Sequence, residues 1–171
     1  MTTSAPARRP VVGLLIALAG LLAGLAILFV YFAPSLGGAW VGIIVDAALT
    51  LAFLFLIFGR SAPLVLRVAF AVATIGWAIL TIGGLVSLGL ILIIGIWFAL
   101  AGTLVSGILV MSRLLFSNAA NVFFLLAAIV IVIVLLNQLI GPFLSSTIGL
   151  VVSVLYAVLL LLAGILIAIR K

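Results

Sequence analysis

The stretch VVGLLIALAGLLAGLAILFVYF, residues 11–32, is apolar along almost its whole length and carries no charged side chain. A bilayer core of about 30 Å requires roughly 20 apolar residues in one helix. Because backbone groups in lipid must be hydrogen-bonded within the segment, this run predicts a transmembrane helix. It is longer than the apolar region of a secretory signal, about 7–15 residues. We therefore expect an uncleaved first helix, preceded by a short disordered N-terminus at residues 1–10.

Five more apolar runs of similar length follow the first one. Glycine and proline separate several of them, with Pro34 after the first run, Gly83-Gly84 after the third and Pro142 after the fifth. The sequence therefore predicts an all-α integral membrane protein with six transmembrane helices in a single domain, residues 11–171. The predicted helices span residues 11–32, 39–58, 62–81, 86–111, 119–139 and 148–169.

Basic residues lie in alternate gaps between the predicted helices. The chain has 7 Lys and Arg residues, one acidic residue and no histidine, which gives a net charge of +6. Short loops with positive side chains resist translocation, so this alternation predicts a multi-pass protein of the cell membrane with both termini in the cytoplasm. Single basic residues beside a membrane indicate contact with anionic headgroups and not with nucleic acid. The topology determinants are Arg8, Arg9, Arg60, Arg67, Arg113, Arg170 and Lys171.

A faint internal repeat relates the three helical hairpins. The segment GILVMSR, residues 107–113, parallels GILIAIR, residues 164–170, and Arg60 aligns with Arg113 in the same way. Internal repeats are common in membrane proteins, and parallel ones share an axis along the membrane normal. The pattern predicts three repeated hairpins, each of which closes with an arginine at the inner surface.

Small residues recur at helical spacing on three of the predicted helices. Lipid provides no hydrophobic drive for helix association, so small side chains promote contact by letting two backbones approach closely. We predict that these residues mark helix-packing faces. They are Gly20 and Gly24 on the first helix, Ala99, Thr103 and Gly107 on the fourth, and Gly149, Ser153 and Ala157 on the sixth.

The composition excludes most catalytic chemistry. General acid–base catalysis needs at least two tuned groups, and a zinc site needs several ligands. One acidic residue, no His and no Cys cannot assemble a triad, a carboxylate pair or such a metal site. The glycines follow no phosphate-binding pattern. We therefore expect neither enzymatic activity nor a cofactor.

Asp46 is the one acidic residue, and it lies inside the second predicted helix. Arg60, the nearest arginine of that helix, is about 21 Å away along the axis and cannot pair with it. Thr50 lies one turn further on the same face. The repeat places Tyr156 at an equivalent depth, from which a hydrogen bond to Asp46 is possible.

Three interpretations of this intramembrane polar site remain open. Asp46 is a protonated, hydrogen-bonded carboxyl at a helix interface, or part of a proton- or cation-linked transport pathway. In the third interpretation it pairs with a basic residue on another membrane subunit.

The chain also resembles the small bacterial acid-resistance membrane proteins of the HdeD type. In those proteins a helix rich in Gly and Leu leads to a Pro-containing outer turn and a Gly-bearing second helix. Gly24 through Pro34 to Gly42 is similar to that unit, and the segment from Pro142 to Gly149 is a partial echo. The middle hairpin lacks the proline. The resemblance implies a stress-associated membrane protein without a defined catalytic site.

The favoured hypothesis is a non-enzymatic accessory subunit or stress-associated membrane protein that acts through helix and lipid contacts. Its partners would be the bilayer and either a second copy of the chain or another membrane subunit. The alternative is a small transporter or channel component that uses Asp46 in a proton- or cation-linked pathway. A transporter requires a polar cavity that reaches Asp46, whereas an accessory subunit packs Asp46 against a helix or a partner.

Overall fold

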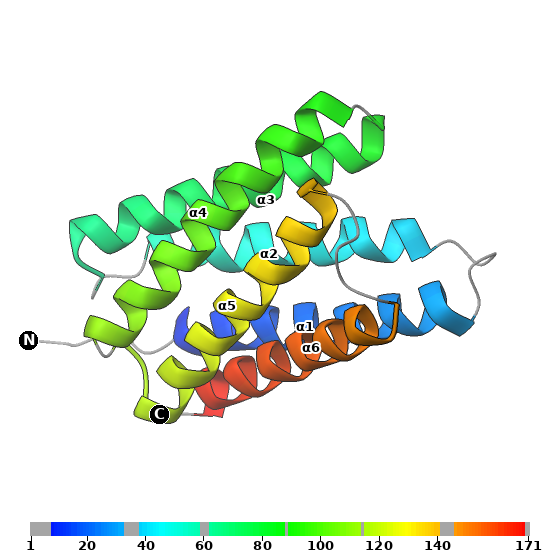
Figure 1. Ribbon diagram of the computed structural model, residues 1–171. Coiled ribbons are helices and arrows are strands. Elements are labelled where there is room, and N and C mark those ends of the chain that lie inside the picture. Colours follow the sequence, from blue (N-terminus) through cyan, green and yellow to red (C-terminus); the bar gives the residue numbers. More distant parts are fainter. Residues whose placement is uncertain are drawn as a thin grey trace, which may run out of the picture.

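A computed structural model describes residues 8–32, 38–58, 62–87, 89–113, 115–140 and 146–169. These residues form six α-helices, as the sequence predicted, and Figure 1 shows their arrangement. Five are long and apolar enough to cross a membrane, and the apolar part of α2, Gly42–Ile57, is shorter. The helices are α1 (Arg8–Phe32), α2 (Gly38–Ile57), α3 (Leu64–Val86), α4 (Gly89–Arg113), α5 (Asn118–Ile140) and α6 (Ser146–Ile169).

The helices form a closed ring in chain order. Each helix packs against its neighbours in the sequence, and α6 packs against α1. Consecutive helices run in opposite directions, so α1, α3 and α5 finish at one end of the bundle, which we call the outer end (Figure 1). At the opposite end, called the inner end, α1 begins and α6 finishes. Large apolar side chains such as Leu14, Leu21 and Leu28 are exposed on the outer surface of the ring, where lipid would contact them.

The backbones of α1 and α6, the first and last helices of the chain, approach each other closely. A Cβ atom placed on Gly20 would lie 2.5 Å from the backbone nitrogen of Leu161. A Cβ on Gly164 would collide with the backbone of Ala17, and Gly13 faces α6 in the same manner. Only glycine permits this separation, and the interface gains dispersion contacts between the two backbones.

A second interface of this kind joins α3 to α4. Side chains on Gly76 and Gly102 would collide with the backbones of Ala99 and Ala73, respectively. Each glycine therefore lies opposite an alanine of the partner helix. The two helices are held at backbone contact at both of these positions.

Both interfaces use the same short sequence. GLLIALAG, residues 13–20 of α1, matches GIWFALAG, residues 95–102 of α4, at five of its eight positions. The shared glycines and the first alanine face the partner helix in each case. The closest helix contacts thus join α3 to α4 and α1 to α6. The threefold repeat of helical hairpins stays a prediction.

The turn between α3 and α4 falls later than the sequence predicted. Residues 82–85, expected as the third gap, lie inside α3, and Ser87 adopts the left-handed conformation with φ 55°. A Cβ on Gly84 would lie 2.9 Å from the side chain of Ile43 on α2. The glycine pair therefore allows neighbouring helices to pack closely and does not form the turn.

Aromatic side chains fill the ring at its inner half. The ring centroids of Phe53 on α2 and Phe124 on α5 lie 6.2 Å apart with an edge-on geometry. Phe70 and Phe116 extend this cluster, at 6.1 Å from Phe53 and 6.4 Å from Phe124. The contact between Phe53 and Phe124 joins two helices on opposite sides of the ring. It closes the interior of the bundle in that half.

Candidate binding cavity

The outer half of the ring contains an open cavity of about 900 Å³. Residues of all six helices line it, and it extends to the first turn of α4 and the last turns of α5 at the outer end. Small residues leave the space open: a Cβ on Gly42 of α2 or on Gly89 of α4 would meet no atom within 4 Å. The volume is typical of a site for a small organic ligand.

A few polar groups interrupt the apolar wall of this cavity. Asp46 is the one charged residue among the described residues that line it. Asn137 and Gln138 lie near the outer end of α5, and Ser153 and Tyr156 lie on α6. Asp46 is eight residues from the start of α2, so it lies about 12 Å from the outer end at 1.5 Å per residue.

The Asp46 carboxylate accepts no hydrogen bond and forms no salt bridge in the part of the chain that the structure describes. Thr50 lies one turn away, as the sequence predicted, but its hydroxyl donates to the main-chain carbonyl of Asp46 at 2.8 Å. A hydroxyl engaged in this way with its own helix cannot donate to the carboxylate. The carboxylate therefore faces the cavity without a donor from its own helix.

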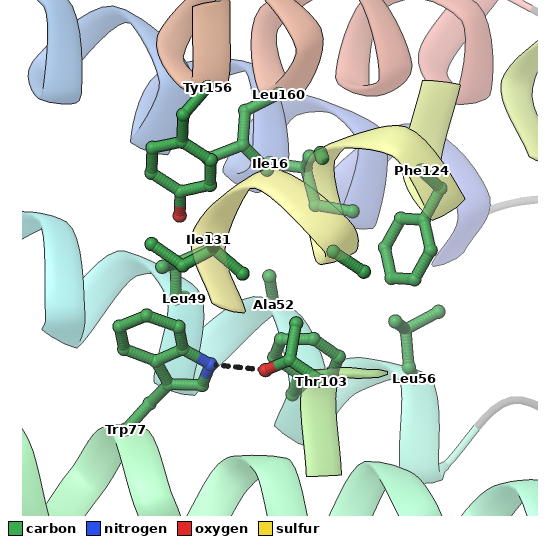
Figure 2. A pocket seen from close by; sticks show the side chains of 13 residues that line it. Ile16, Leu49, Ala52, Leu56, Trp77, Thr103, Phe124, Ile131, Tyr156 and Leu160 are labelled. Atoms are coloured by element: carbon green, nitrogen blue, oxygen red, sulfur yellow. Dashed lines mark hydrogen bonds between the residues drawn. The ribbon is translucent and has the colours of Figure 1, made fainter. Parts of the chain in front are cut away.

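Tyr156 approaches the same cavity from α6. It is 7% exposed, and its phenol points into the bundle with the hydroxyl directed toward Ile131 and Leu49 (Figure 2). Asp46 and Tyr156 line one cavity from two helices. No hydrogen bond joins them among the described residues.

Trp77 forms part of the floor of the cavity. Its indole Nε1 donates a hydrogen bond to Thr103 Oγ1 at 3.0 Å, between α3 and α4 (Figure 2). Both side chains are buried, at 2% and 6% exposure. Thr103, predicted from the sequence as part of a packing stripe, thus holds the indole ring in one orientation.

Below this floor lies a second, much smaller cavity of about 20 Å³. Trp77, Ile131 and Tyr156 line both cavities and separate them. The walls of the small cavity are otherwise almost entirely apolar, and Phe53 and Phe124 lie in its lining. A water needs two to four polar partners, which such a site does not offer. The polar lining of the large cavity therefore ends at Trp77 and Tyr156.

The remaining predicted packing residues have two different environments. Gly149 and Ser153 line the large cavity. Gly107 faces α5, where its Cβ would lie 2.8 Å from that of Ala128. Ala157 lies against α1: its carbonyl oxygen would be 2.9 Å from a Cβ on Gly20, and its Cβ is 3.9 Å from one on Gly24. Ala99 lies opposite Gly76 in the α3–α4 interface.

The described arginines lie at the inner end of the bundle. Arg8 and Arg9 begin α1, and Arg113 is exposed in the last turn of α4. Arg67, in the first turn of α3, donates from Nε to the carbonyl of Ala62 at 2.9 Å. The clustering agrees with a single basic face, while the side of the membrane that it faces stays a prediction. Arg60, Arg170 and Lys171 lie outside the described residues.

Sequence reasoning did not identify several residues that shape this interior. Trp77, Asn137 and Gln138 were not predicted to line a site, and Gly13, Gly76 and Gly164 were not among the predicted packing residues. The matching segments 13–20 and 95–102 were a usable signal for the packing glycines. Nothing in the sequence indicates which helix each one contacts.

No protein-family model, no curated protein and no solved structure matches this chain.

Proposed function

We propose that this protein is a small multi-pass membrane transporter or channel component in which Asp46 binds a cation or proton that enters from the outer end. One observation carries the proposal: a cavity of about 900 Å³ reaches a carboxylate that has no hydrogen-bond or ion-pair partner among the described side chains. An accessory subunit would instead pack Asp46 against a helix or a partner chain.

The energetics of the site support this role. An Asp at the centre of a membrane helix costs about 2.5–3.5 kcal/mol on the translocon scale, and somewhat less near the interface. A small uncharged side chain such as Ser at position 46 would avoid the cost of the charge. Ionisable groups within membranes usually mark a substrate or ion pathway.

The closed inner half requires a conformational change for passage across the membrane. The helix pairs α1–α6 and α3–α4, held at backbone contact, are suited to move as rigid units. The contact between Phe53 and Phe124, which joins α2 to α5, would have to open. This arrangement supports a mechanism in which the cavity is accessible from one side at a time.

Flux measurements on the purified full chain in liposomes test the proposal. Proton flux is followed with an internal pH-sensitive dye, and Na⁺ and K⁺ fluxes with tracer ions. Asp46→Asn preserves the shape of the side chain and removes its charge, so we expect it to abolish the flux. Thr74→Val is the matched control, because Thr74 bonds its own helix at Phe70 and lies outside the cavity.

Unchanged flux in Asp46→Asn would defeat the transport role. The competing assignment is a partner subunit whose basic residue pairs with Asp46. Purification in mild detergent distinguishes it, because a stoichiometric second protein that is lost in Asp46→Asn would support the subunit hypothesis.

A further inference from the structure

We infer that the cavity binds an organic monocation with an apolar body, such as a substituted ammonium ion, with its positive charge at Asp46 and beside Trp77 and Tyr156. The inference rests on the proposed function and specifies the ligand of that site. Four features of the cavity support it: the charge of its wall, the character of the remaining surface, the volume and the aromatic floor.

The charge of the wall selects for one positive charge. Asp46 is its single carboxylate, and no Lys or Arg lies among the described residues that line the cavity. An anion would therefore meet a negative group without a compensating cation, and a dication would keep one charge unpaired in an apolar site. A monocation is neutralised by one contact.

The rest of the wall does not suit an inorganic ion. A metal ion of the Ca²⁺ type takes 6–8 oxygen ligands, and no cluster of three or more acidic, His or Cys residues exists in the described part of the chain. Most of the lining consists of Ala, Val, Leu and Ile side chains, including Ala23, Leu92 and Val134. Such walls gain free energy by covering apolar ligand surface.

The volume points to the same class of ligand. A cavity of about 900 Å³ is far larger than one dehydrated ion and lies within the range for drug-sized molecules, about 300–1,000 Å³. The apolar residues lie mainly between Asp46 and the outer end. We therefore expect the charged group at the floor and the apolar body toward Asn137 and Gln138 at the mouth.

Aromatic rings complete the binding site for a cation. Trp77 and Tyr156 both line the cavity, and the bond from Trp77 to Thr103 fixes the indole. A cation within about 6 Å of an aromatic face is attracted by the ring quadrupole, and quaternary ammonium groups are recognised in this way. The aromatic contact favours an alkylated ammonium over a hydrated metal ion, because its methyl groups pack directly against the rings.

Direct binding to the full chain in lipid nanodiscs tests the inference. The probe is benzyltrimethylammonium, measured by equilibrium dialysis against empty nanodiscs. Two competitors separate the contributions: tetramethylammonium keeps the charge without the apolar body, and neopentylbenzene replaces the charged nitrogen by carbon. We expect saturable binding of one probe per chain and weak competition by both compounds.

Two variants probe the site itself. Asp46→Asn should weaken binding of the probe at least about tenfold, because it removes the only counter-charge. Gly42→Leu should weaken it while the carboxylate is kept, since the new side chain extends into the open space beside Gly42. Thr74→Val removes a hydroxyl that bonds only its own helix and lies outside the cavity, so this variant should retain binding and controls for a general disturbance of the fold.

The outcomes separate the inference from the proposed function. Asp46-dependent flux of protons or Na⁺ without saturable binding of the probe would overturn the inference and leave the transport role in place. Competition by tetramethylammonium as strong as by the probe would also overturn it. Asp46-dependent binding without any flux would support the ligand assignment and remove the transport role.

Discussion

The indole nitrogen of Trp77 and the hydroxyl of Thr103 form a buried hydrogen bond between α3 and α4, 3.0 Å long, at the floor of the large cavity. The bond does two things at once. It satisfies the single polar atom of a buried tryptophan, and it orients the indole ring that separates the large cavity from the small one beneath it. The stability of the helix pair and the shape of the site therefore depend on the same contact.

Thr103→Val should destabilise the protein by about 1–3 kcal/mol, because it preserves the shape of the side chain and leaves a buried N–H without an acceptor. Thermal unfolding in detergent measures the change. Thr103→Ser retains the hydroxyl and should recover most of the loss. Thr74→Val removes a hydroxyl that bonds only its own helix, so its effect should be smaller. Equal losses in Thr103→Val and Thr103→Ser would show that the bond contributes little.

Substitution by alanine should change the stability of the protein in opposite directions at two of its glycines. Gly164→Ala places a methyl group against the backbone of Ala17 and should cost about 1–3 kcal/mol, as overpacking does. Gly42→Ala places the same group in open space and should stabilise α2 by up to about 1 kcal/mol through helix propensity. Denaturation of both variants under identical conditions gives the comparison. Similar values for the two would contradict the interface between α1 and α6.

Asn121 is expected to hold the connection between α4 and α5. Its fully buried amide accepts from the backbone nitrogen of Phe116 at 3.0 Å and donates to the carbonyl of the same residue at 3.3 Å. Asn121→Ala leaves both groups without a partner and should cost about 1–3 kcal/mol. Asn118→Ala, at an exposed position of the same helix, is the matched control in the same unfolding assay. A cost no greater than that of the control would exclude the role.

The number and type of the helices follow from the sequence because the hydrocarbon core sets the length of each apolar run. Their partners do not. Gly13 and Gly164 meet only when the first helix lies beside the last, and local periodicity carries no information on such distant contacts. Gly83-Gly84 illustrates a second limit, since a glycine pair suits both a turn and a close helix contact. Gly84 forms a close helix contact, because the side chain of Ile43 packs against it.

At the candidate site, too, one part could be predicted from the sequence and another part could not. Asp46 was identifiable from composition, because one acidic residue within an apolar helix is unusual. Its surroundings were not, because six helices combine to form the cavity. Thr50 shares the face of Asp46, yet its hydroxyl bonds the main chain. Spacing along a helix predicts which residues are neighbours and does not predict which atoms they bind.

The orientation in the membrane can be tested directly because the chain has no cysteine of its own. Ser87, after α3, and Ser112, in the last turn of α4, are both exposed at opposite ends of the bundle. If the basic face is cytoplasmic, a membrane-impermeant thiol reagent should label Ser87→Cys on intact cells and Ser112→Cys only after permeabilisation. Each variant serves as the control for the other, because both must be expressed and both must react with the reagent after permeabilisation. The reverse pattern would place the mouth of the cavity in the cytoplasm, so that Asp46 would receive its cation from inside the cell.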